Sequence, residues 1–177
     1  MANWFVGVRV PAGDWFAGLP EIPKGFQRFA PADLHITLAF LGDVGPMAAR
    51  QAWEARQAHG PIEAELGAVR PFGGKGPIYS ALSAEVDTPA VKALLNSQRN
   101  VLRAAAGLAP EQRTVWPHAT LTRPVHTATE AQLRSGLAWA REVQVAGTPV
   151  VLKRLALFTH AGPHLPGLFR VVYETSL

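Results

Sequence analysis

The stretch Leu-His-Ile-Thr-Leu-Ala-Phe-Leu-Gly, residues 34–42, sets two polar side chains inside a run otherwise bulky enough to be a buried strand. In an extended chain, successive side chains point to opposite faces. One face of this strand would carry only apolar side chains, those of Leu34, Ile36, Leu38 and Phe40. The other face would present His35 and Thr37, so function is sought there.

The pattern recurs in Trp-Pro-His-Ala-Thr-Leu-Thr-Arg, residues 116–123, where His118 and Thr120 are again two positions apart. A single histidine on a strand is most often a structural residue. Two histidines that each precede a Thr-Leu pair at the same spacing rarely arise by chance in a chain with six histidines. The recurrence predicts that the two strands share one function.

The two histidines suit the cleavage of a phosphodiester. One group must take a proton from the nucleophile and another must give a proton to the leaving oxygen. Imidazole can do either near neutral pH, so His35 and His118 are the candidate acid and base. Thr37 and Thr120 are candidate phosphate ligands, because a hydroxyl can donate to a non-bridging oxygen. Such a reaction needs no metal and no other cofactor.

Other chemistries fit the sequence less well. The chain has no Gly-x-Ser-x-Gly motif and no cysteine, which argues against a serine hydrolase, a thiol nucleophile, a thiolate metal site and a disulfide. Asp33 precedes His35 by two positions, but no acidic residue precedes His118 in this way. His160 and His164 are separated by glycine and proline, which disfavours a metal-binding helix.

Composition predicts one folding unit of 177 residues, because 48% hydrophobic residues suffice for a core. No signal peptide or membrane-spanning run is apparent, so a cytoplasmic monomer is the default expectation. The formal charge of +4 and the excess of arginine over lysine favour an anionic partner. GC-rich codons would produce the same bias.

Strands and helices are expected on both sides of each motif. Strands are expected at 4–10, 26–30, 62–69, 78–86, 150–158 and 169–173, with 62–69 and 78–86 forming a hairpin. Helices are expected at 47–58, from Asp87 or Thr88 to Gly107, and from Thr127 or Thr129 to Ala140. The repeated order predicts two related lobes whose His-x-Thr strands face one cleft.

These motifs resemble those of the two-histidine phosphoesterase superfamily, in particular its RNA 2′,3′-cyclic phosphodiesterase branch, also called 2′-5′ RNA ligase. Phe-Val-Gly-Val-Arg-Val-Pro (residues 5–11) is similar to the first strand of that family, and residues 34–42 and 117–123 are similar to its two signatures. The resemblance implies an α+β fold. It would have two antiparallel sheets related by a pseudo-twofold axis, flanking helices and a central cleft, within one two-lobed domain of residues 1–177.

The resemblance further implies hydrolysis of a terminal 2′,3′-cyclic phosphate, on RNA or a nucleotide, to a 2′-phosphate. His118 would activate water and His35 would protonate O3′, although the sequence fits the reverse equally well. Arg123 would be a third phosphate ligand, but strict alternation points it away from the His118 face unless the strand ends before it. Ligation of RNA ends through a 2′-5′ bond would be a minor activity.

Three further residues are candidates for RNA binding: Trp116 and Phe5 by stacking on bases, and Arg28 by contact with the backbone. Two alternative functions stay open at this point. The chain could be a non-catalytic module that binds RNA ends, or a phosphodiesterase for another cyclic or 2′-5′ linked nucleotide.

Overall fold

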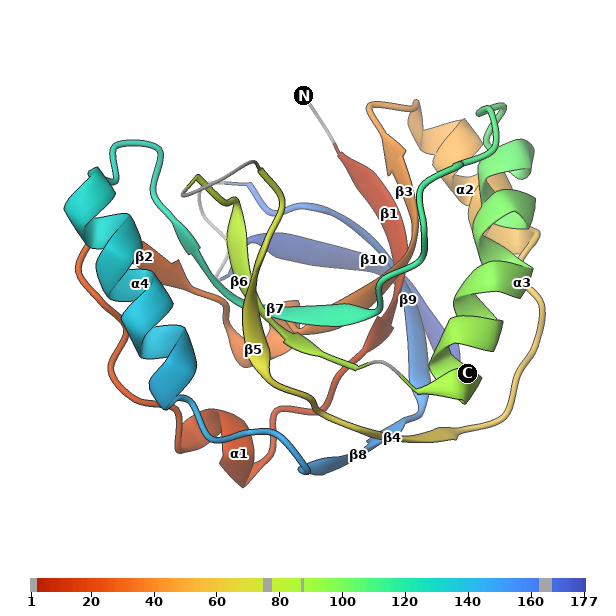
Figure 1. The fold of residues 1–177 in the computed structure, drawn as a ribbon. Coiled ribbons are helices and arrows are strands. Elements are labelled where there is room, and N and C mark those ends of the chain that lie inside the picture. The colour runs from red at the N-terminus through yellow and green to blue at the C-terminus, as the bar shows by residue number, and fades with distance from the viewer. Residues whose placement is uncertain (1–2, 75–77, 87, 163–166) are drawn as a thin grey trace.

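The computed structural model describes residues 3–74, 78–86, 88–162 and 167–177. Two four-stranded antiparallel sheets form its centre (Figure 1). The first sheet has the order β10-β9-β1-β3, with β10 (Phe169–Ser176), β9 (Arg154–His160), β1 (Trp4–Arg9) and β3 (His35–Gly42). The second has the order β2-β7-β6-β5, with β2 (Phe26–Arg28), β7 (His118–Pro124), β6 (Ala81–Glu85) and β5 (Val69–Phe72). The expected α+β class with antiparallel sheets is confirmed.

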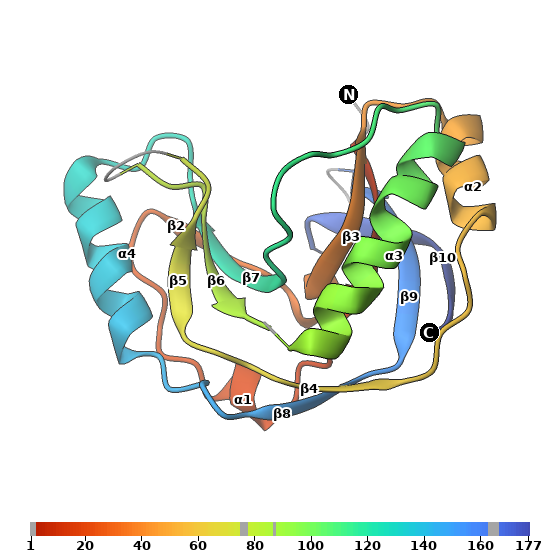
Figure 2. The same ribbon diagram turned by 45° about the vertical axis from the view of Figure 1, so that its right-hand side comes forward.

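Helices cover the outer sides of the two sheets. Figure 2 shows α2 (Pro46–Glu54) and α3 (Pro89–Ala105) beside the first sheet and α4 (Glu130–Glu142) beside the second. A two-stranded ribbon of β4 (Ile62–Glu65) and β8 (Pro149–Leu152) runs between the two sides. The short α1 (Asp14–Ala17) follows β1, and one 3-10 turn, Pro31–Asp33, leads into β3. Strands β3 and β7 lie next to each other where the sheets meet.

The sequence explains where the two longest helices begin. Thr88 caps α3 by accepting a hydrogen bond from the main chain of Val91, and Pro89 occupies the first turn. Thr129 and Gln132 form a reciprocal capping box on α4. Both caps were among the expected alternatives, although Asp87 lies outside the described residues. Helix α2 ends at Glu54, four residues before the predicted end.

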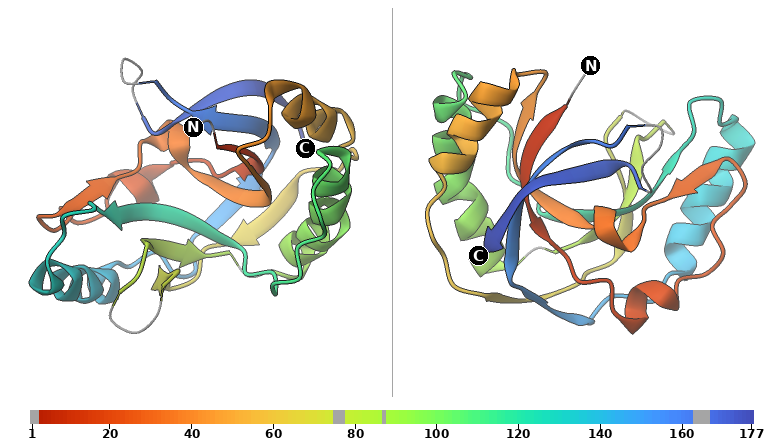
Figure 3. Two further views of the ribbon diagram at one scale, coloured as in Figure 1. Left: turned by 90° about the horizontal axis from the view of Figure 1, so that it is seen from above. Right: turned by 180° about the vertical axis from the view of Figure 1, so that it is seen from behind.

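Two of the expected strands are each divided between sheets. Within the 62–69 run, residues 62–65 form β4, which pairs with β8, and Val69 begins β5, which extends to Phe72 and pairs with β6. The predicted pairing of 62–69 with 78–86 therefore holds only at Val69, which opposes Ala84. Gly67 lies at the division, where an added Cβ would come within 3.0 Å of the Glu85 Cβ. The 150–158 run likewise becomes β8 and β9, and β10 then runs along β9 at the edge of the first sheet (Figure 3).

Both His-x-Thr strands carry a β-bulge at the leucine after the threonine. In the β1–β3 pair, Gly7 opposes Thr37 and the preceding residue opposes Ala39, so Leu38 is the extra residue. In the β6–β7 pair, the partners of Ser83 and Leu82 are Thr120 and Thr122, so Leu121 is the extra residue. A bulge resets the alternation of side chains between the two faces. The shared bulge supports the expected pseudo-twofold relation of the two strands.

The bulges overturn two expectations about side-chain direction. Phe40 was expected in the core, but it is 49% exposed, because the bulge returns it to the face of Thr37. Arg123 stands in the corresponding position of β7. It shares the face of Thr120, since Thr122 opposes Leu82 and is fully buried on the opposite face. The strand therefore need not end before Arg123 for this side chain to face the site.

Candidate active site

The two histidines occupy the same position in their strands and are held in the same way. His35 is the first residue of β3, and its Nδ1 lies 2.6 Å from the carbonyl oxygen of Asp33. His118 is the first residue of β7, and its Nδ1 lies 2.7 Å from the carbonyl oxygen of Trp116. A carbonyl oxygen only accepts, so each Nδ1 must donate the hydrogen. Each neutral ring then has its lone pair on Nε2.

Three phenylalanine rings surround His35. Its ring centroid lies 4.5 Å from that of Phe5, 5.1 Å from Phe158 and 5.3 Å from Phe169, which meets it edge-on. Gly7 lies in the neighbouring strand beside His35, where an added Cβ would come to 3.0 Å from the Ile36 carbonyl oxygen, so the close approach of β1 to β3 favours glycine. Phe5 is only 4% exposed. Phe5 packs against the His35 ring and is covered by other side chains. Since its own ring is not accessible to a base, the prediction that it stacks on one is wrong.

His118 lies in a less enclosed position. Its ring stacks on Phe72 of β5 with the centroids 3.7 Å apart. Trp116 contacts the same phenylalanine at 5.3 Å and is 40% exposed. Trp116 thus combines an accessible ring with a position beside a catalytic candidate, as the stacking prediction for it requires. The prediction itself is not tested by this geometry.

Burial lowers the pKa of both histidines, but by different amounts. The pKa of His35 is lowered to about 4, chiefly by burial among apolar rings and in addition by the positive charge of His118, while the hydrogen bond to the Asp33 carbonyl and the charge of Asp33 act in the opposite direction. Burial also lowers the pKa of His118, against its hydrogen bond to Trp116. His118 is charged when His35 titrates, so the first proton bound by the pair goes to His118.

The threonines lie on the same strand faces as the histidines. The Thr120 hydroxyl is 3.2 Å from the hydroxyl of Ser83 on β6, and either oxygen can be the donor. Ser83 is 2% exposed and directly opposes Thr120 in the sheet. Sequence reasoning missed Ser83, because a serine in a run of small residues carries no local signal. Its position fixes the orientation of the Thr120 hydroxyl.

A pocket of about 340 Å³ lies between β3, the start of β7 and α3. Strands β3, β5 and β7 contribute Thr37, Leu38, Phe40, Phe72 and His118 to its lining. Helix α3 and the segment that follows it contribute Leu95, Arg99, Arg103, Glu111, Arg113, Thr114 and Trp116. His35 and Thr120 do not line this pocket, although they share strand faces with residues that do. A volume of this size is in the range of small-molecule sites.

The two predicted arginines differ in their relation to the site. Arg123 lies on the Thr120 face, half-buried, with its guanidinium carbon 6.0 Å from the centre of the Phe29 ring. Arg28 opposes Thr122 and therefore lies on the other face of the second sheet. Its guanidinium donates to the Phe16 carbonyl oxygen and covers the Phe16 ring at 4.6 Å. The structure does not bring Arg28 to the histidine pair.

In the described part of the chain, no three His, Cys, Asp or Glu side chains gather as a metal site would require. His160 is exposed at the end of β9, and His164 lies outside the described residues. Among the same described residues, no helix has the length and apolar character needed to cross a membrane.

Fold and site together define an α+β protein with paired His-x-Thr strands, and solved structures share this fold. The protein TT0787 of Thermus thermophilus matches with a TM-score of 0.66 and 20% identity, over 99% of this chain and 97% of that chain. E. coli LigT complexed with NADP+ matches at 0.67 and 19%, over 99% and 96%. A structure described as a phosphoesterase matches at 0.70 and 17%, over 99% and 97%.

No family model and no curated protein sequence matches the chain. The likeness to LigT is therefore one of fold, and it extends over nearly the whole chain.

Proposed function

We propose that this protein is a 2′,3′-cyclic phosphodiesterase that opens a terminal cyclic phosphate, on RNA or a nucleotide, to a 2′-phosphate. One observation carries the proposal. His35 and His118 each direct Nδ1 to the carbonyl oxygen two residues before, so both rings have Nε2 available for proton transfer. Two imidazoles held in the same tautomer on neighbouring strands suit a reaction that needs one base and one acid.

In this reaction, water attacks the phosphorus and the bond between phosphorus and O3′ breaks. A neutral histidine takes the water proton at Nε2, and a protonated histidine gives its Nε2 proton to O3′. The protein then carries the same number of protons as before, with the proton moved from one ring to the other. Before the next turnover, the base must release the proton it took from water, and the acid must take up a new one.

The order of protonation in the free protein favours His35 as the base and His118 as the acid, because His118 binds the first proton. This is the reverse of the assignment first expected. A substrate with sulfur in place of O3′ distinguishes the two, since a thiolate leaves without protonation. His118→Ala should regain most of its lost rate on this substrate and His35→Ala should not. If only His35→Ala regained its rate on the sulfur substrate, His35 would be the acid and His118 the base, as first expected.

The remaining polar groups suit the stabilisation of the developing charge on phosphorus. Thr37 and Thr120 would each donate a hydroxyl hydrogen to a non-bridging oxygen. The hydroxyl of Thr120 is oriented by Ser83, 3.2 Å away. Arg123 lies on the Thr120 face and would supply positive charge.

Nucleotides are the substrate class that the site supports best. Trp116, Phe72 and Phe40 give the pocket an aromatic lining on which a base could stack. E. coli LigT, which has the same fold, has been crystallised with 3′-AMP, ATP and NADP+. Joining of RNA ends through a 2′-5′ bond would use the same groups, with the 5′-hydroxyl of a second RNA end attacking phosphorus in place of water and O3′ again leaving, and is proposed as a minor activity.

The direct test is turnover of a nucleoside 2′,3′-cyclic phosphate in the presence of a chelator, with the product identified by phosphorus NMR. We expect the product to be a 2′-phosphate. We expect His35→Ala and His118→Ala each to lower the rate by a factor on the order of a thousand. A 3′-phosphate product, or wild-type turnover in either variant, would refute the mechanism. Binding of RNA ends without any turnover would favour the non-catalytic alternative.

A further inference from the structure

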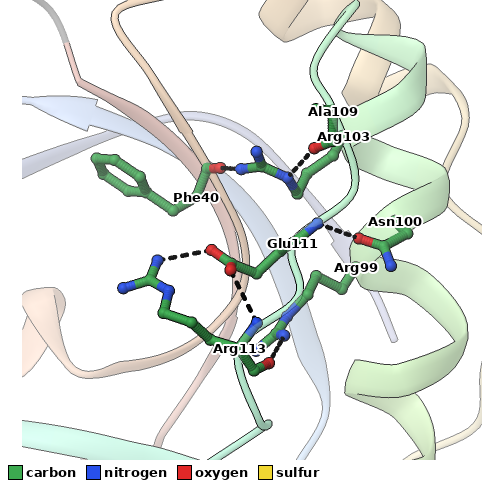
Figure 4. A network of polar contacts seen from close by, with 7 residues as sticks. All are labelled: Phe40, Arg99, Asn100, Arg103, Ala109, Glu111 and Arg113. Carbon is green, nitrogen blue, oxygen red and sulfur yellow. Dashed lines mark hydrogen bonds and ion pairs between the residues drawn. The ribbon is translucent and has the colours of Figure 1, made fainter.

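An arginine cluster lines the same pocket as Thr37 and His118. It consists of Arg99 and Arg103 on α3 and Arg113 in the segment between α3 and β7 (Figure 4). Among the described lining residues, Glu111 is the one carboxylate that faces these three guanidinium groups. The pocket therefore continues from a candidate phosphate ligand into a region of positive charge.

Arg99 and Arg103 hold the segment between α3 and β7 in place. Arg103 donates from Nε to the Ala109 carbonyl oxygen at 2.9 Å and from Nη1 to the Phe40 carbonyl oxygen at 2.7 Å. Arg99 donates from Nη1 to the Arg113 carbonyl oxygen at 2.6 Å. Arg99 and Arg103 thus tie α3 to the segment, and Arg103 also ties α3 to β3, so both guanidinium groups have a structural role.

Arg113 has no comparable structural role. Its guanidinium pairs with Glu111, two residues away in the same segment, at 2.6 Å, and its main-chain N–H donates to the same carboxylate at 3.0 Å. Its side chain is nevertheless 82% exposed. Figure 4 shows the Arg113 guanidinium and the Phe40 ring projecting to the same side, away from α3. An exposed ion pair of this kind contributes little by itself, so a phosphate can compete for the guanidinium.

The chemistry of the substrate indicates which phosphate this would be. A 2′,3′-cyclic phosphate closes the 3′ end of a strand, so any further nucleotides continue from the 5′ oxygen of the same ribose. With the cyclic phosphate between the histidines, the next phosphate along the strand is the phosphodiester on that 5′ oxygen. An arginine fork is well suited to bind its two non-bridging oxygens.

We propose that Arg113 binds the phosphodiester on the 5′ side of the terminal nucleotide, which makes RNA 3′ ends of two or more nucleotides the preferred substrates. Arg99 and Arg103 position the segment that presents it. The inference rests on the proposed function and adds to it a substrate class and a residue that determines specificity.

The test compares three substrates: a nucleoside 2′,3′-cyclic phosphate with a free 5′-hydroxyl, the same nucleoside with a 5′-phosphate, and a dinucleotide that ends in the cyclic phosphate. The value of kcat/KM for the dinucleotide, divided by that for the free nucleoside, should fall about fivefold in Arg113→Gln. Arg134→Gln is the matched control. Arg134 is also an exposed arginine paired with a glutamate, but it lies on α4, outside the pocket, and the ratio should not change.

The 5′-phosphorylated nucleoside separates the two sources of a second phosphate. A response to Arg113→Gln with the dinucleotide supports a phosphodiester of RNA, whether or not the 5′-phosphate responds as well. A response with the 5′-phosphate alone would assign the site to a mononucleotide and overturn the proposal. An unchanged dinucleotide ratio in a protein that turns over all three substrates would also overturn it, while the proposed function would stand.

A binding measurement separates this inference from the proposed function. Affinity for a fluorescein-labelled RNA trinucleotide with a terminal 2′-phosphate is measured by anisotropy at several salt concentrations. Loss of one phosphate contact in Arg113→Gln should reduce the slope of log affinity against log salt by about 0.7. If no cyclic phosphate is turned over but this slope change is found, the proposed function is wrong and the Arg113 site stands. An unchanged slope refutes the site.

Discussion

Replacement of Asp33 tests whether the segment before β3 positions His35. The carboxylate of Asp33 is 1% exposed and accepts hydrogen bonds from the main-chain N–H groups of Ala30, Leu168 and Phe169, at 2.9 to 3.1 Å. Its carbonyl oxygen receives Nδ1 of His35. Asp33 thus ties the start of β3 to the start of β10, whose first residue packs against the His35 ring.

The expected loss of stability follows from these contacts. Asp33→Ala leaves three main-chain donors without their acceptor in a buried site, at roughly 1 to 2 kcal/mol each, or about 4 kcal/mol in total. Asp33→Asn keeps one acceptor oxygen and should cost about half as much. The total stability of a domain is typically only about 5 to 15 kcal/mol, so the alanine variant should be close to unfolding at body temperature.

Urea unfolding at pH 7 measures the free energy, with Asp43→Ala as the control, because Asp43 is exposed after β3. A positioning role also predicts a lower kcat in Asp33→Asn with little change in KM, since the Nε2 of His35 would be displaced while the pocket is kept. A loss below about 1 kcal/mol in Asp33→Ala, or an unchanged kcat in Asp33→Asn, would refute the reasoning.

Three further predictions concern stability and rate. The folded pKa of His35 is about 4, below the 6.5 of the unfolded chain, so stability is lost as the pH falls through this window. His35→Gln should reduce the loss between pH 7 and pH 4 by about 3 kcal/mol in urea titrations; an equal loss in both proteins would contradict the burial argument. Gly136→Ala should destabilise the protein by about 2 kcal/mol although alanine favours helices, because its Cβ would collide with the Phe26 ring; a raised melting temperature would show otherwise. Ser83→Ala should lower kcat about tenfold by releasing the Thr120 hydroxyl while leaving urea stability within about 1 kcal/mol; an unchanged kcat would remove Ser83 from the site.

The repeated motif made the strand positions and the candidate chemistry predictable. The spacing of His35 and Thr37 in an apolar run identified both a strand and the face on which function should be sought, and His118 and Thr120 repeated that signal. The helix starts could be predicted equally well from the sequence, because Thr88 and Thr129 precede long runs of helix-forming residues. These signals depend only on residues near each other in the sequence.

The parts that sequence reasoning missed depend on partners from elsewhere in the chain. The bulge at Leu38 is defined by the register with β1, so alternation within β3 alone wrongly placed Phe40 in the core. Phe5 is an aromatic residue near a motif, but only the packing of β1 against β9 shows that its ring is covered. Ser83 acquires its significance from its register partner in β7.

In the proposed reaction, the two histidines of the duplicated motif take different roles because their surroundings differ. The motif gives each histidine the same strand position and the same acceptor for Nδ1, two residues earlier, so the tautomer is equal on both sides. The surroundings are not repeated. His35 packs against three phenylalanine rings, whereas His118 has a single phenylalanine stacked on it.

Since charge is costly in an apolar enclosure, the more enclosed ring stays neutral and the other holds the proton. A pair with equal surroundings would bind its first proton on either ring. Here the unequal packing sets the order of protonation: burial lowers the pKa of both rings, and a single proton bound by the pair lies on His118. In the proposed reaction, the division between acid and base therefore comes from the phenylalanine side chains of β1, β9 and β10 and not from the motif, which is the same in both strands.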